Sequence, residues 1–149
     1  MTREKFASQI KADKRLGLVD GEALARELTM HIGDGEAIRG WMVLKERKRE
    51  SNHEQKFEIA IVSDNHFILV HVDGFRTGVL VNHWSAPIGR LRAINTDRMS
   101  GDREGEGGFC LDFAPPVFGE DSAVVFRLDK GWPTDEARTF LAAVAAARK

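Results

Sequence analysis

Short apolar runs, each closed by a turn signal, fill the middle of the chain from about residue 38 to residue 129. Turn pairs such as Asp64-Asn65 and Asp73-Gly74 separate neighbouring runs. Apolar and polar residues alternate within residues 57–63 with the period of two that is typical of a strand. The pattern predicts seven strands, over residues 38–47, 57–63, 66–73, 77–84, 88–95, 109–114 and 122–129.

The N-terminal residues have helical spacing instead. Residues 2–15 predict a short basic helix with Phe6 and Ile10 on one face. Asp20 is a suitable N-cap for a second helix over residues 21–32, in which apolar residues recur at every fourth position. We therefore expect an N-terminal helical extension over residues 1–32. The pattern leaves open whether these helices pack on the strands or on a neighbouring molecule.

The C-terminal residues predict one further helix, from Pro133 to about Ala147. Asp135 and Glu136 lie in its first turn, where the helix dipole favours negative charge. Its apolar stripe consists of Phe140, Leu141 and Val144. The chain as a whole is therefore predicted to be mainly β, of the α+β class, with seven strands followed by one helix.

Composition and charge narrow the function classes. The chain has 149 residues, which fits one domain, and its net charge is −1. A nucleic-acid partner is not expected, because phosphate binding usually requires a basic excess. Cys110 is the only cysteine, which excludes an internal disulfide and a multi-cysteine zinc site. The charged N-terminal residues carry no signal-peptide pattern, so we expect a cytoplasmic protein.

Several short motifs occur in an order that points to a known superfold. These motifs are Gly33-Asp34-Gly35-Glu36-Ala37-Ile38, Ile61-Val62-Ser63-Asp64, Asp73-Gly74 and Ala86-Pro87-Ile88-Gly89-Arg90-Leu91. Together with the order of seven strands and one helix, they resemble the pleckstrin-homology superfold, and more narrowly bacterial PH-like domains. The resemblance implies a PH-like domain over residues 33–149, a seven-stranded bent barrel with a C-terminal capping helix. It also implies a non-catalytic module that binds a protein partner or assembles with itself.

A basic run near the end of the first predicted strand is a candidate ligand site. It consists of Lys45, Arg47, Lys48 and Arg49. In eukaryotic relatives of this superfold the first turn binds inositol phosphates, and Arg76 would lie in a second contributing turn. The resemblance therefore implies, as an alternative function, peripheral binding to anionic phospholipid. Interleaved glutamates, such as Glu46 and Glu50, would offset much of this charge and favour a solvated turn.

Catalytic and metal-binding patterns are weak. The histidines are His31, His53, His66, His71 and His83, and none has the close spacing of a metal motif. A third alternative is a small enzyme that uses a histidine–carboxylate pair in the barrel mouth. The pairs considered are His66 with Asp64 and His71 with His83 across a hairpin. For each of these histidines the favoured interpretation is a surface or cross-strand packing residue.

Nucleophilic serines and cofactor motifs are also weak. Ser63 and Ser85 lie near histidines, but neither is in a nucleophile-elbow motif, and Cys110 has the pattern of a thiol within a strand. The glycine-rich residues 101–108 lack the Lys-Ser/Thr ending of a phosphate loop. No catalytic residue, metal or cofactor is predicted.

Aromatic residues supply the last candidates. Trp41, Trp84 and Trp132 lie in or beside predicted elements, and core packing is the expected role for each. Residues 113–118 instead form an apolar loop with two prolines, and exposed apolar loops mark partner contacts. The partner-contact candidates are Phe113, Pro115, Pro116 and Phe118. The leading hypothesis is a non-enzymatic cytoplasmic interaction module that binds a protein partner or forms a homo-oligomer.

Overall fold

The structure, a computed structural model, describes residues 1–16, 20–49, 54–75, 78–95, 107–115, 123–128 and 134–148. The helices are α1 (Arg3–Ala12), α2 (Gly21–Thr29) and α3 (Thr134–Ala147), with short 3₁₀ turns η1 (Lys14–Leu16) and η3 (Ile88–Arg90). The strands are β1 (Ile38–Arg49), β2 (Glu54–Ser63), β3 (His66–Phe75), β4 (Gly78–Pro87), β5 (Leu91–Asn95), β6 (Gly107–Phe113) and β7 (Ala123–Leu128).

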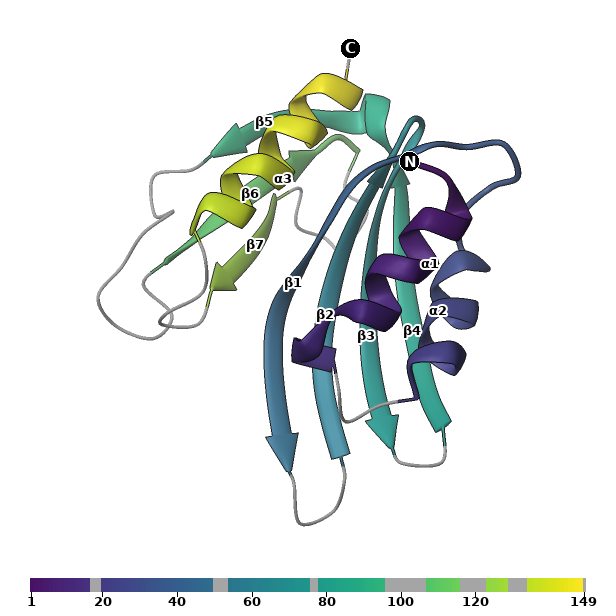
Figure 1. Ribbon diagram of the computed structural model, residues 1–149. Helices are drawn as coiled ribbons and strands as arrows, with labels where there is room; N and C mark the ends of the chain where they lie inside the picture. Colours follow the sequence, from purple (N-terminus) through teal and green to yellow (C-terminus); the bar gives the residue numbers. More distant parts are fainter. Residues whose placement is uncertain are drawn as a thin grey trace.

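The strands form two antiparallel sheets (Figure 1). The larger sheet has the order β1-β2-β3-β4, and the smaller sheet has the order β5-β6-β7. In the described residues no strand pairing joins the two sheets. The α+β class with mostly antiparallel strands is therefore confirmed, while closure into a seven-stranded barrel stays a prediction.

The larger sheet is buried on both faces because its central strands carry apolar residues at both parities. In β2, Phe57, Ile59 and Ile61 face one side, and Ala60 and Val62 face the other. All five side chains are fully or almost fully buried. A strand with this composition needs a covering layer on each face.

The N-terminal helices cover one face of the larger sheet (Figure 1). Phe6 and Ile10 of α1 and Leu24 and Leu28 of α2 are buried in one cluster with residues of β1, β2 and β3, which we call the helix-side core. The predicted N-cap is confirmed, since the Asp20 carboxylate accepts hydrogen bonds from the Glu22 and Ala23 amides. The helices thus pack on the strands of their own chain; the domain boundary after residue 32 stays a prediction.

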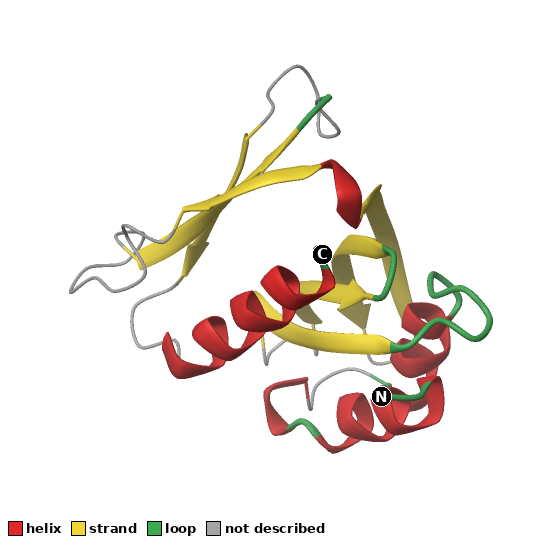
Figure 2. Ribbon diagram, turned by 90° about the horizontal axis from the view of Figure 1, so that it is seen from above, coloured by secondary structure: helices red, strands yellow, loops and turns green. Residues whose placement is uncertain are grey.

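The opposite face is covered by α3 and the smaller sheet (Figure 2). Phe140 and Val144 of α3 are buried with Met42, Phe67 and Phe113, in a cluster that we call the α3-side core. Gly40 of β1 allows the close approach of α3, because a Cβ atom there would lie 3.1 Å from Cβ of Ala143. The predicted C-terminal helix and its apolar stripe are therefore confirmed.

Three local predictions differ from the structure. Residues 88–90 form η3 rather than the start of a strand, because Pro87 and Gly89 favour a turn there. The second helix ends at Thr29, before the last apolar repeat at Ile32. Trp84 was expected in the core, but 46% of its surface is exposed. Trp132 lies outside the described residues.

Candidate functional site

The β4 edge, by which we mean the outer side of Gly78–Pro87, is an open strand edge. In the described part of the chain, β4 pairs with β3 on one side and with no strand on the other. The strand is ten residues long and contains no Asp, Glu, Lys or Arg. Natural edge strands are usually protected by charges, bulges or short length. The β4 edge has none of these features, and its register with β3 is continuous.

The two faces of β4 differ in what covers them. Val79 and Val81 are partly buried against the helix-side core. The alternate residues Leu80 and Trp84 face the other side and are 65% and 46% exposed, while Ala86, further along, enters the α3-side core. Valine and leucine alternate in the sequence at these positions. That pattern does not indicate that the layer covering the Leu80 face stops short of Trp84.

The end of α2 lies beside β4. The His31 ring stacks on the His83 ring of β4 with a centroid distance of 3.7 Å and an interplanar angle of 30°. Met30, at the same helix end, is 66% exposed. Together with Leu80 and Trp84, it is one of the exposed large hydrophobic residues of the described chain, and all three lie on β4 or on the helix that packs on it.

The fold disfavours the charged form of the His31 imidazole. Its pKa is lowered, first because burial disfavours the charged ring and second because of the neighbouring His83, while Glu27 acts weakly in the opposite direction. Its Nε2 atom is buried and has no hydrogen-bond partner among the described residues. A proton on that nitrogen would therefore lack an acceptor.

The opposite edge of the sheet, at β1, is covered. The α3 helix packs against β1, and β7 also lies close to it. Arg15 of η1, on the helix side of the sheet, donates to Glu136 of α3 on the other side, at 2.7 and 2.9 Å. Hydrogen bonds from Arg15 to Asp13, and then to Glu136, raise the pKa of the Arg15 guanidinium, which stays charged. This ion pair connects the layers around the β1 side of the sheet.

The predicted basic run lies within β1 rather than in a turn. For Lys45, Arg47, Lys48 and Arg49 the structure describes the backbone alone, and Arg76 lies outside the described residues. In the β1–β2 register Lys45 is opposite Glu58 and Arg49 is opposite Glu54. Opposite charges at paired positions stabilise a sheet and reduce the field available to a ligand.

The sheet face that carries the α3-side core also carries, further along its strands, a mixed ionic cluster. His71 lies 3.8 Å from Glu58 and 3.8 Å from Asp73, and the Lys56 amine lies 3.9 Å from Asp73. Each polar side chain in this cluster thus has a neighbour within the cluster. Such partly exposed contacts are typical of a solvated sheet face.

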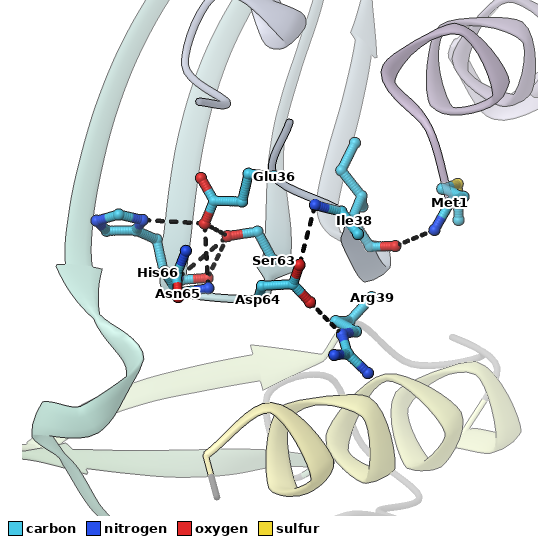
Figure 3. A network of polar contacts seen from close by, with 9 residues as sticks. Met1, Glu36, Ile38, Arg39, Ser63, Asp64, Asn65 and His66 are labelled. Atoms are coloured by element: carbon cyan, nitrogen blue, oxygen red, sulfur yellow. Dashed lines mark hydrogen bonds and ion pairs between the residues drawn. The ribbon is translucent and has the colours of Figure 1, made fainter. Parts of the chain in front are cut away.

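A second polar network ties the loop before β1 to the turn between β2 and β3 (Figure 3). The Glu36 carboxylate accepts hydrogen bonds from the Ser63 hydroxyl and the Asn65 amide, and it lies 3.1 Å from Nδ1 of His66. Burial opposes ionisation of Glu36, but the hydrogen bonds from Ser63, His66 and Asn65 outweigh it and lower its pKa.

The neighbouring Asp64 makes a parallel set of contacts in Figure 3. Its carboxylate accepts from the Arg39 side chain and from the Ala37 amide, and both lower the pKa of Asp64. The Met1 nitrogen donates to the Ile38 carbonyl at 2.6 Å beside it. These contacts all cap backbone or pair charges at a hairpin turn. The network is therefore a structural clamp.

Neither predicted histidine pair is formed. His66 contacts Glu36 rather than Asp64. His71 is opposite Asn82 in the register, and His83 is opposite Val70, so His71 and His83 point to opposite sheet faces. His53 lies outside the described residues.

The candidate nucleophilic side chains, like the histidines, lie in surroundings that do not favour catalysis. Ser63 is buried and donates to a carboxylate rather than to a histidine ring. Ser85 is exposed on β4. The pKa of the half-buried Cys110 is raised, by burial and then by Asp112, which disfavours its reactive thiolate form. Among the described residues, no group of three or more His, Cys, Asp or Glu side chains could hold a metal ion.

The predicted partner-contact loop is wrong at its first residue. Phe113 is fully buried in the α3-side core, because it is the last residue of β6 and faces α3. Pro115 is exposed, and its carbonyl accepts a hydrogen bond from Arg90 at 2.7 Å. Pro116, Phe118 and most of the glycine-rich segment lie outside the described residues.

No family model matches the chain, and the comparisons with curated proteins and with solved structures find no match either. The resemblance to PH-like domains therefore stays a prediction. Within the described residues, none of the helices combines the length and the apolar content that crossing a bilayer requires. Function must be argued from the surface itself.

Proposed function

We propose that this protein is a non-enzymatic interaction module whose binding surface is the β4 edge, and that the occupant is an extended, uncharged segment of a protein. The observation that carries the proposal is an open strand of ten residues without a charged side chain. Exposed Leu80 and Trp84 on one face of that strand add apolar contacts. The leading hypothesis from the sequence was a module that binds protein. The proposal names the surface with which that module would bind.

Strand addition uses both features. An open edge presents unpaired amide and carbonyl groups, which give affinity through main-chain hydrogen bonds, and alternate side chains give selectivity. Leu80 and Trp84 would contact side chains of the added strand on one face. A charged segment would gain nothing from β4, because β4 offers no opposite charge.

The two polar clusters described above support the choice of β4, because their side chains already contact one another. The side chains around His71 contact one another, and the network around Glu36 closes a turn. The order of seven strands and one final helix also supports the PH-like assignment, including the finer prediction of a bent barrel. The PH-like superfold in turn favours a binding role over catalysis.

Anionic phospholipid is the second candidate because of the basic run in β1. The β1–β2 register favours β4 over this run, since Glu54 and Glu58 stand opposite two of its four cations. The enzyme alternative lacks both histidine pairs on which it was based. Binding to anionic vesicles would distinguish the lipid alternative from binding at β4.

The test is a titration of the ¹⁵N-labelled chain with a synthetic peptide of residues 78–87, flanked by lysines for solubility. Amides of β4 should shift on binding, whereas amides of β1 should not. The control peptide has proline in place of Val81, which removes a backbone donor and disfavours an added strand. Absence of shifts at β4 at millimolar peptide, or equal shifts with the proline peptide, would contradict the proposal.

A further inference from the structure

The β4 edge is compatible with a copy of itself, and the β1 edge is not. Two β4 strands placed side by side bring no Asp, Glu, Lys or Arg together. Two antiparallel β1 strands centred at Arg47 would place Arg47 opposite its own copy and Lys45 opposite Arg49. Like charges directly opposite each other destabilise a strand pair. Charge complementarity thus selects β4 for pairing between identical chains.

Symmetry restricts how two β4 strands can pair. A two-fold axis perpendicular to the sheet makes the strands antiparallel and keeps equivalent faces on the same side. The axis passes beside one residue of the strand, which we call the pairing centre. Every other residue lies opposite the residue of the second copy that is the same number of positions away on the other side of that centre. A centre at Asn82 places Leu80 opposite Trp84 of the second copy, twice in the dimer. It also places the two Asn82 side chains together, and an amide can donate to and accept from its own copy.

Neighbouring centres fit less well. A centre at Val81 places Leu80 opposite Asn82, and a centre at His83 places Leu80 opposite the buried Ala86. Both leave Trp84 without an apolar partner in the added strand. The centre at Asn82 is the one that covers the two exposed hydrophobic residues of β4 with each other.

We propose that the occupant of the β4 edge is a second copy of this chain, paired antiparallel through β4 about a two-fold axis at Asn82. This inference rests on the proposed function, because it names the partner of the same edge. The pairing joins two four-stranded sheets into one continuous sheet. It covers Leu80 and Trp84 without requiring any residue outside the described chain.

The experiment is cysteine cross-linking in a Cys110→Ala background. Paired Cα atoms across an antiparallel ladder lie roughly 4.5–5.5 Å apart, within the range that a disulfide bridges. Asn82→Cys should therefore form a disulfide-linked dimer under mild oxidation. The matched control is Ser85→Cys, also exposed on the same strand. Ser85 is opposite Val79 of the second copy, so its two copies stand about 20 Å apart and should not cross-link.

Light scattering of the unmodified chain over a range of concentrations separates the possible failures. A dimer whose Asn82→Cys form does not cross-link, or whose Ser85→Cys form cross-links equally, overturns the pairing centre. A chain that stays monomeric at every concentration overturns the second copy as partner. If the peptide of residues 78–87 still binds that monomer at β4, the proposed function stands. If it does not bind, the proposed function falls as well.

Discussion

The two edges of the larger sheet differ in charge and in cover. In β1 six of the twelve residues are charged, namely Arg39, Lys45, Glu46, Arg47, Lys48 and Arg49, and α3 with the Arg15–Glu136 pair closes that side. The β4 strand has no charged residue and pairs, in the described chain, with β3 alone. We therefore propose that the β4 edge, rather than the β1 edge, is the one used for association.

The difference also extends to the layers beside each edge. On the β1 side, a carboxylate and a guanidinium that stays charged connect η1 to α3. On the β4 side, two stacked imidazoles connect the end of α2 to the strand. The first contact joins opposite charges, whereas burial at the second disfavours a charged His31 ring. The two sides should therefore respond differently to substitution and to pH.

The largest effect is expected from charges placed on β4. Leu80→Lys combined with Trp84→Lys should weaken self-association at least about 100-fold, because two apolar contacts are lost and like charges approach. Both side chains are exposed, so the fold should be retained. Sedimentation velocity measures the effect. The matched control, Lys48→Glu with Arg49→Glu on β1, should leave the dimer unchanged; an equal loss in the control would remove the distinction between the edges.

The second prediction concerns the cover of β1. Glu136→Gln should lower the free energy of unfolding by roughly 1 kcal/mol, a value that allows for partial solvent screening. Arg15 keeps its contacts to Asp13, so the loss stays modest. Chemical denaturation measures the change, and Arg138→Gln, an exposed position on the same helix, is the control. A change in dimer affinity in Glu136→Gln would show that the β1 side also takes part in association.

The third prediction concerns pH. Because the pKa of His31 is lowered in the folded state, the unfolded chain binds more protons, and stability rises with pH. The stabilisation is complete above the ordinary value of 6.5 and is lost as pH falls below it. Thermal melts between about pH 7.5 and 5.5 measure the loss.

The control for this prediction keeps the stacked ring. His31→Phe should reduce the pH dependence while leaving an aromatic contact to His83. His71→Gln, on the other sheet face, should preserve it. The groups that shift the pKa of His31 are His83 on β4 and Glu27 on α2, and Arg3, paired with Asp34, donates to the Thr29 carbonyl at the end of α2. Equal pH dependence in His31→Phe and in the unmodified chain would contradict this assignment.

The smallest effect is expected at the membrane. Co-sedimentation with neutral and anionic vesicles should show no salt-sensitive binding, because glutamates stand opposite two cations of the basic run. The Lys48→Glu/Arg49→Glu variant should then behave like the unmodified chain. Binding to anionic vesicles that high salt and this variant both remove would instead favour the phospholipid alternative and move the functional edge to β1.

Most of the fold followed from local patterns. The strand pair around Asp64-Asn65, the Asp20 cap and the stripe of α3 each depend on neighbouring residues, so sequence alone predicted them. The residue Phe113 was misplaced because prolines after it indicated a loop, while its own burial depends on the distant α3. How the two sheets pack against each other depends on long-range contacts that periodicity does not report.

The candidate site was harder to predict than the fold. Whether Trp84 is covered depends on how far α3 and the smaller sheet extend, and His31 meets His83 only through the tertiary packing of α2. One signal was present in the sequence. Residues 78–87 lack any charged side chain, whereas β1, β2 and β3 each carry some. Read as an edge strand, that segment would have been the candidate in place of the basic run.

Amide hydrogen exchange at two protein concentrations tests the central claim most directly, because it reads both edges in one sample. If β4 is the edge that pairs, amides of residues 79–86 that point away from β3 should exchange more slowly as concentration rises, while amides of β1 keep the same rates. Protection that rises at β1 instead, or at neither edge, would contradict the account.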